Sequence, residues 1–175
     1  KKQEKKDKKE EQFKEQITQL EDERETLLKD LSALAVQLSE QRAEAALRIS
    51  AGVEKELEDL RMPSARFEVR MEKFPSESGI SDKNGERLAF SDNGFDRVEF
   101  LIAPNPGEGL KPLAKVASGG ETSRLMLALK NTLAQADTIP TMVFDEIDQG
   151  IGGRIGALVG EKLWQLSRYH QVICI

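Results

Sequence analysis

The chain has 175 residues, with 31 acidic side chains against 26 Lys and Arg and a formal net charge of −5. Charged residues make up 33% and aromatic residues only 5%, so part of the chain must be a solvated element with little core. The acidic balance argues against a protein that coats nucleic acid through bulk charge, although it is compatible with a local basic patch. The single cysteine excludes a disulfide framework, and no His/Cys cluster indicates zinc.

No apolar run approaches the roughly 20 residues needed to cross a membrane, and there is no secretory signal. We therefore expect a soluble, cytoplasmic protein that does not act at a membrane. The chain begins at Lys1 and stops within the apolar run 172–175. We expect it to be a piece of a larger protein.

Residues 1–62, here called the arm, contain no proline and one glycine, Gly52. Apolar residues recur in steps of four and three, which predicts the heptad seam of a coiled coil. The seam consists of Phe13, Ile17, Leu20, Leu27, Leu31, Leu34 and Leu38, with Arg24 at the missing position. It resumes with several steps of four at Ile49, Val53, Leu57 and Leu60, which predicts a local change of supercoil. So narrow a stripe needs a partner helix, from the same protein or from another molecule.

The start of the arm, residues 1–16, consists almost entirely of Lys, Glu, Asp and Gln. This composition indicates a solvated helix end. The alternative is a nucleic-acid contact through the lysines, which the interleaved acids weaken.

Residues 63–114 are predicted to be a β-rich connector. Pro63 ends the arm, since proline disfavours helical geometry at the residue before it. Alternating apolar residues predict half-buried strands at 67–71 and 97–103, with a short strand at 87–90 between two turn signals. We expect a loop at 76–85. No catalytic constellation is found here, so the predicted role is structural.

The segment 115–175 contains the candidate functional residues. Ser118 precedes an apolar helical pattern as an N-cap residue should, and Glu121 lies where a capping-box acid belongs. Between them, Gly119 and Gly120 let a ligand approach the helix N-terminus, whose free N–H groups suit a phosphate oxygen. The alternative is an ordinary capped helix.

A second motif begins with the short apolar run 141–144, which predicts a buried parallel strand. Asp145 and Glu146 follow at its carboxyl end, where ligands bind in open α/β sheets. The pair resembles the Walker B element of P-loop ATPases, in which the first acid holds Mg²⁺ and the second polarises the attacking water. The alternative is a solvated acidic strand end. A glycine-rich loop, a helix at about 155–166 and a strand at 172–175 complete a β–α–β order.

The arm and the segments VASGGETSRLMLALK (116–130) and FDEIDQGIGG (144–153) together resemble the C-terminal half of an SMC-type ATPase head of the ABC class. Within that class they are most similar to bacterial DNA-repair members, with the strongest match over 115–175. The resemblance implies a partial α/β P-loop NTPase-like head preceded by a coiled-coil segment. It divides the chain into the arm, 1–62, and the C-terminal lobe of the head, 63–175.

The resemblance also implies roles for matching residues. Ser118, Gly119 and Gly120 would form the signature loop that contacts the γ-phosphate of ATP held by a second head, with Glu121 beside them. Asp145 would hold Mg²⁺, Glu146 would be the catalytic base, and Asp148 would lie at the interface between heads. Arg124 is a weaker candidate for supporting the interface or the nucleotide.

The chain departs from the family by lacking a GxxxxGK[ST] phosphate loop and a histidine just after the last strand. We therefore expect this chain alone not to hydrolyse ATP. The whole protein would be a nucleoid-associated homodimer with ATP between its heads and an antiparallel partner helix on each arm. It would act on DNA in double-strand break repair and recombination. The alternatives are another SMC-like repair or chromosome-organising ATPase, an ABC transporter domain, and a non-hydrolysing coiled-coil scaffold.

Four other residues near the end of the chain receive structural interpretations. We expect His170 to lie on the surface, Trp164 and Tyr169 to pack the last helix, and Cys174 to be a buried thiol.

Overall fold

The computed structural model describes residues 2–116, 120–145, 147 and 153–175. The chain divides into two compact units. The first unit comprises Lys1–Arg42 and Glu72–Asp96, and the second comprises Ala43–Met71 and Arg97–Ile175. The arm therefore contributes to both units.

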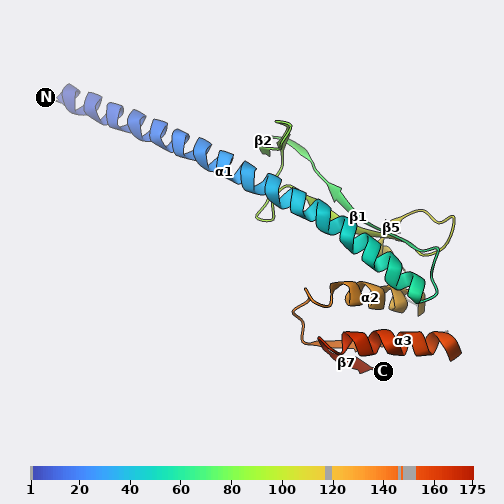
Figure 1. Cartoon of the computed structure of the whole chain (residues 1–175). Coiled ribbons are helices and arrows are strands. Elements are labelled where there is room, and N and C mark those ends of the chain that lie inside the picture. Colours follow the sequence, from blue (N-terminus) through green and yellow to red (C-terminus); the bar gives the residue numbers. More distant parts are fainter. Residues whose placement is uncertain (1, 117–119, 146, 148–152) are drawn as a thin grey trace. The chain divides into compact units, whose positions relative to one another are not determined.

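The arm forms one continuous helix, α1 (Lys2–Asp59), as its lack of proline predicts (Figure 1). It ends before Pro63, in a backbone motif that the sequence did not reveal. Arg61 takes a left-handed conformation with a φ of 63°. The N–H of Arg61 then donates to Glu58 O at 3.0 Å, and that of Met62 to Leu57 O at 2.8 Å. These two bonds form a Schellman motif and satisfy carbonyls that the helix end leaves unpaired.

The first unit packs the strands β2 (Pro75–Ser81) and β3 (Arg87–Leu88) against the arm. They pair antiparallel, with an irregular register between Pro75 and Ile80. The predicted loop at 76–85 was therefore wrong over 76–81. Gly79 explains the pairing, because a Cβ there would collide with the carbonyl group of Leu88. A small core of Ala35, Ile80, Leu88 and Phe95 holds the unit together.

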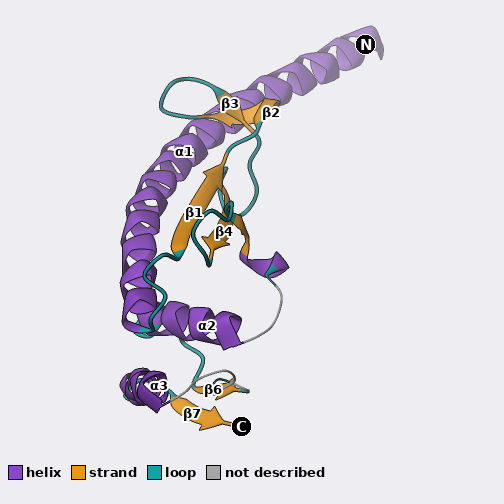
Figure 2. Ribbon diagram, turned by 90° about the vertical axis from the view of Figure 1, so that its right-hand side faces the viewer, coloured by secondary structure: helices purple, strands orange, loops and turns teal. Residues whose placement is uncertain are grey.

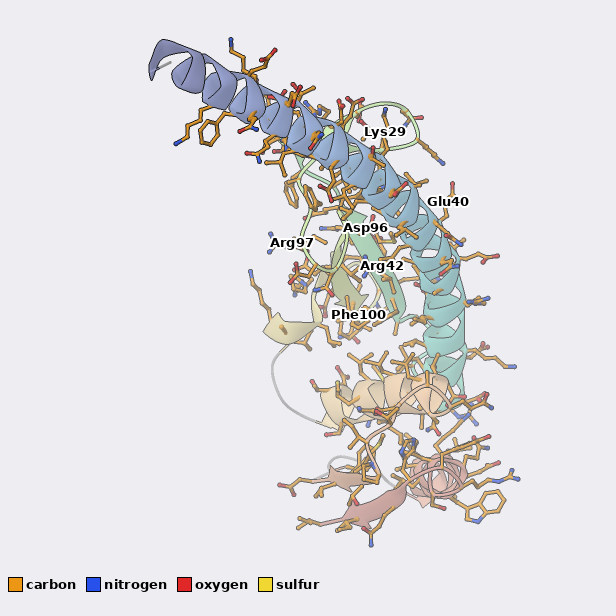
Figure 3. The ribbon with its side chains drawn as sticks, turned by 90° about the vertical axis from the view of Figure 1, so that its left-hand side faces the viewer. Lys29, Glu40, Arg42, Asp96, Arg97 and Phe100 are labelled. Atoms are coloured by element: carbon orange, nitrogen blue, oxygen red, sulfur yellow. The ribbon has the colours of Figure 1, made fainter. Side chains whose placement is uncertain are left out.

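A buried carboxylate also ties the first unit together. The Asp96 side chain is 1% exposed and accepts a hydrogen bond from Ser39 Oγ at 2.8 Å. Arg42 Nη1 lies 3.4 Å from its other oxygen, and Figure 3 shows these two side chains facing each other. The face of α1 that packs in this unit thus includes Ala35 and Ser39. The predicted seam lies on another face, where Phe13, Ile17, Leu20, Leu27, Leu31 and Leu34 are all exposed.

The second unit begins with a three-stranded sheet in the order β1 (Arg66–Glu72), β4 (Arg97–Ala103), β5 (Lys111–Pro112). The strands predicted at 67–71 and 97–103 are confirmed. A 3₁₀ turn, η1 (Leu113–Lys115), follows β5, which pairs antiparallel with β4.

The rest of the second unit alternates helices with strands: α2 (Gly120–Leu133), β6 (Thr141–Phe144), α3 (Gly153–Leu166) and β7 (Gln171–Cys174). β6 and β7 pair in parallel, from Thr141 opposite Gln171 to Phe144 opposite Cys174. The predicted parallel pairing and β–α–β order are confirmed. The predicted burial of β6 was wrong in part, because Val143 is exposed. Helices α2 and α3 lie side by side, and Figure 2 shows α3 next to the two strands.

The core of the second unit joins the end of α1 to both later helices. Val53, Leu57 and Leu60 are fully buried there with Leu125, Leu127 and Leu166. The altered spacing marks the point where α1 meets this core. The change of supercoil stays a prediction. Gly52 allows the close approach, since a Cβ there would lie 2.8 Å from Thr132 Cγ2.

Three of the smaller interpretations were also wrong. His170 is buried, because backbone carbonyls from the α2–β6 connection surround its ring. Trp164 and Tyr169 are exposed and do not pack α3, and Cys174 is exposed on β7. Among the described helices, none combines the length and the apolar character that a membrane span requires.

Candidate nucleotide site

The N-terminus of α2 is the first predicted element of the site. The helix begins at Gly120, and Glu121 is an exposed acid in its first turn. A carboxylate there interacts favourably with the positive end of the helix dipole. Ser118 and Gly119 lie outside the described residues, so the capping box and the signature loop stay predictions.

The second element is the carboxyl end of β6. Asp145 follows the strand directly and is exposed. Because β7 runs parallel to β6 and Ile175 N–H donates to Phe144 O at 3.0 Å, both strands end at the same edge as Asp145. Glu146 and Asp148 lie outside the described residues. Their roles, and that of Asp145 as a metal ligand, are untested.

Ile147 is a residue of this region that the sequence analysis did not single out. It lies between Glu146 and Asp148, yet its side chain is buried in the core of the second unit. The sequence feature that could have identified Ile147 is its apolar side chain within a run of acids. The burial of Ile147 fixes one point of the chain between β6 and α3.

The connection from α2 to β6 is held by an ion pair. Lys130 Nζ lies 2.8 Å from Asp137 Oδ2, while Asp137 Oδ1 accepts the N–H of Ile139 at 3.0 Å. The hydrogen bond from Lys130, followed by that from Ile139, holds the pKa of Asp137 below its usual value. The carboxylate therefore fixes the turn that leads into β6.

His170 closes the same connection from the start of β7. Its Nδ1 lies 2.7 Å from Ile139 O and its Nε2 lies 3.0 Å from Ala134 O. Both partners are carbonyl oxygens, which only accept. A neutral imidazole can donate to one of them, and the imidazolium to both. The side chain thus has a structural task and takes no part in the candidate site.

Arg124 stands out on α2, one turn after Gly120. Its side chain is half-buried, and its Nε is fully buried without a hydrogen-bond partner in the structure. A buried donor left unpaired is costly, which favours an anionic partner that the described residues do not supply. No group of three or more potential ligand residues within the described ranges could hold a metal ion.

These features fit one part of a nucleotide-phosphate site: an unpaired cationic donor, a helix N-terminus, and a carboxylate at the end of a parallel strand. A GxxxxGK[ST] loop that would cradle the phosphates is absent from the sequence.

Comparisons with known proteins agree with this fold. No family model matches the chain. It is 41% identical over 153 residues to the DNA repair protein RecN of Streptomyces coelicolor, covering 87% of this chain and 27% of that protein. It is also 41% identical over 166 residues to RecN of Treponema pallidum, covering 91% and 28%. The chain therefore spans about a quarter of the length of these curated relatives.

Among solved structures, the Smc head domain with a coiled coil and joint from Pyrococcus yayanosii aligns with a TM-score of 0.50. It is 21% identical and covers 77% of this chain and 22% of that one. The fold is therefore that of part of an SMC/ABC-type, P-loop ATPase-like head with a long helical arm. Within that class, the sequence relatives show that the chain belongs to the RecN family of bacterial DNA repair proteins.

Proposed function

We propose that the chain is the C-terminal part of an SMC-like ATPase that binds and hydrolyses ATP between two heads and acts on DNA in double-strand break repair and recombination. The placement of Asp145 carries the proposal, since it is exposed at the carboxyl end of a parallel strand. The kinship with RecN over most of the chain supports the DNA part. Other SMC-like repair or chromosome-organising ATPases are the alternative within the class.

Residues of this chain would bind the γ-phosphate, hold the metal ion and activate the attacking water. Ser118, Gly119 and Gly120 bind the γ-phosphate held by the opposite head, using N–H groups at the start of α2. Asp145 holds Mg²⁺, and Glu146 orients and deprotonates the attacking water. Asp148 lies at the contact between heads. Bound ATP and Mg²⁺ supply the reactive phosphate bond and the neutralisation of its charge.

The proposal requires a further part of the head. Parallel strands are usually covered on both faces, yet Val143 on β6 is 58% exposed and Ile173 on β7 is 42% exposed. Their exposure supports the presence of further strands and helices that cover the sheet in the whole protein. The phosphate loop would belong to that further part. This chain alone is therefore expected to be inactive.

The arm requires a partner as well. Its seam residues from Phe13 to Leu34 are exposed, which supports an antiparallel helix from the same protein packing along them. The whole protein would then be a homodimer of arm-bearing heads, closed by ATP and opened by hydrolysis, acting on DNA at the bacterial nucleoid.

Trapping the closed state tests the assignment of Glu146. In the full-length protein, Glu146→Gln should still bind ATP but not hydrolyse it, so ATP and Mg²⁺ should shift it to a stable dimer. Light scattering with and without ATP measures this shift. Glu161→Gln, an exposed acid on α3, is the matched control and should behave as the unchanged protein. If ATP no longer promotes association of Glu146→Gln, the assignment is wrong.

A further inference from the structure

Lys162 is a buried lysine in the middle of α3. It is 7% exposed, and lysine is almost never buried without a charged partner. Its Nζ lies 2.6 Å from Asp59 Oδ2 and 3.1 Å from both carboxylate oxygens of Glu56. Burial lowers the pKa of Lys162, but the hydrogen bonds to Asp59 and Glu56 outweigh it and raise the pKa above its usual value. The lysine is therefore a cation held by two acids of α1.

The two acids lie at the C-terminal end of a helix, where negative charge is least favourable. Glu56 and Asp59 belong to the last turn of α1, whose carbonyls already form the negative end of the helix dipole. That turn has no basic residue of its own. Lys162 supplies from α3 the positive charge that the end of α1 lacks. The end of the arm is thus completed electrostatically by another helix.

The connection joins two segments with different proposed tasks. α1 ends three residues after Glu56 and is the base of the arm. α3 begins at Gly153, directly after the acidic loop that contains Asp145, Glu146 and Asp148. Ile147, shortly before α3 in the chain, is buried in the same core that buries Leu57. A shift of the arm base therefore moves the start of α3 unless the ion pairs break.

An ionic connection differs from the apolar packing around it. Apolar contacts have no preferred direction. A buried cation between two carboxylates keeps its hydrogen bonds only in a narrow range of positions. Replacing such a group by apolar or neutral residues is often harmless to stability. We therefore attribute to the ionic cluster a role in fixing the positions of α1 and α3 rather than in adding stability.

We propose that Lys162, Glu56 and Asp59 form an ionic link between α1 and α3 that fixes the position of the start of α3 relative to the base of the arm. Lys162 is then a positioning residue for ATP hydrolysis. This consequence rests on the proposed function, while the link itself is a property of the described chain.

Four variants of the full-length protein test the link. Lys162→Met leaves two acids without their cation, whereas Lys162→Met combined with Glu56→Gln and Asp59→Asn removes all three charges and is expected to fold. Lys162→Arg keeps the charge. Lys111→Met is the matched control, because it breaks an exposed lysine pair with Glu108, which involves neither α1 nor α3.

The neutral triple variant should lower kcat by at least about tenfold while KM for ATP changes less than twofold, as expected when a catalytic group is misplaced but binding is kept. Lys162→Arg should restore most of kcat, and Lys111→Met should leave it near that of the unchanged protein. An unaltered kcat in the triple variant would overturn the positioning role.

Hydrogen exchange separates this proposal from the proposed function, because it needs no turnover. In the triple variant, backbone amides at 56–62 and at 153–160 should both exchange faster, and Lys111→Met should leave both segments unchanged. If the unchanged protein hydrolyses no ATP but this paired effect is present, the link stands and the proposed function fails. Faster exchange at 56–62 alone would show that α1 and α3 are not coupled.

Discussion

At the scale of single residues, Arg61 is held in a backbone conformation that favours glycine. Its φ of 63° is left-handed, which costs a residue with a side chain about 1–2 kcal/mol. The hydrogen bonds of Met62 and Arg61 at the end of α1 hold it there. The position would suit glycine, the usual residue at this point of a Schellman motif.

Arg61→Gly is expected to stabilise the chain. Glycine removes the left-handed cost but loses more entropy on folding, so the net gain in the free energy of unfolding should be about 0.5–1 kcal/mol. Denaturant unfolding measures it. Arg61→Ala keeps the strain and serves as the control. A loss of stability in Arg61→Gly would mean that the arginine side chain makes a larger contribution than the backbone strain costs.

Gly52 gives a second test at this scale. Gly52→Ala should gain up to about 1 kcal/mol of helix propensity, but the added methyl meets Thr132 Cγ2, and overpacking costs about 1–3 kcal/mol. We expect a net loss in the native background. In a Thr132→Ser background, which lacks that methyl, the same change should become stabilising. Equal effects in both backgrounds would show that the two helices do not meet at this point.

At the scale of elements, the connection between α2 and β6 depends on the charge of Asp137. Lys130 and the N–H of Ile139 lower the pKa of this carboxyl in the folded chain. A lowered folded-state pKa gives stability that is fully present above the unfolded-state value and is lost as the pH falls through the folded-state value. The connection should therefore weaken in acid.

Comparing the chain with Asp137→Asn measures this dependence. The stability difference between the two should be constant above about pH 5 and should shrink as the pH falls below the ordinary aspartate pKa of about 3.9. Denaturant unfolding from pH 3 to pH 7 gives both curves, with the exposed Asp92→Asn as the control. A difference that does not change with pH would contradict the role given to the ion pair.

The elements also show what sequence could and could not predict. β4 and β6 were predicted with their observed bounds, because each is an apolar or alternating run between clear breakers. β2 was missed, since its residues do not alternate and its pairing depends on Gly79 meeting Leu88. His170 was misplaced for a related reason: its burial depends on Ala134 O and Ile139 O, which lie about 30 positions earlier in the chain.

At the scale of the whole molecule, the arm carries two apolar surfaces with different uses. One face packs within the chain through residues such as Ala35 and Val53, whereas the first part of the seam, from Phe13 to Leu34, stays exposed. The periodicity predicted the seam, but it could not show which apolar positions the chain itself covers. The candidate site is likewise only partly predictable, because Ile147 and the unpaired Arg124 Nε become meaningful only in three dimensions.

Charged substitutions separate the two surfaces of the arm. Leu27→Glu changes an exposed seam residue, so the free energy of unfolding of this chain should change by less than about 0.5 kcal/mol. Ala35→Glu buries a charge in the first unit and should cost at least about 2 kcal/mol. In the whole protein, Leu27→Glu should also loosen the paired arm, which limited proteolysis would detect. Strong destabilisation of this chain by Leu27→Glu would mean that the seam is already covered.

The central claim is that these motifs belong to a working ATPase head. Steady-state ATP turnover by the full-length protein, with and without linear double-stranded DNA and beside its Glu146→Gln variant, tests it most directly. We expect turnover that rises with DNA and falls at least about a hundredfold in the variant, as loss of a general base and water-positioning group predicts. Absence of turnover under every condition, or full activity in Glu146→Gln, would contradict the claim, and the first result would favour a non-hydrolysing scaffold.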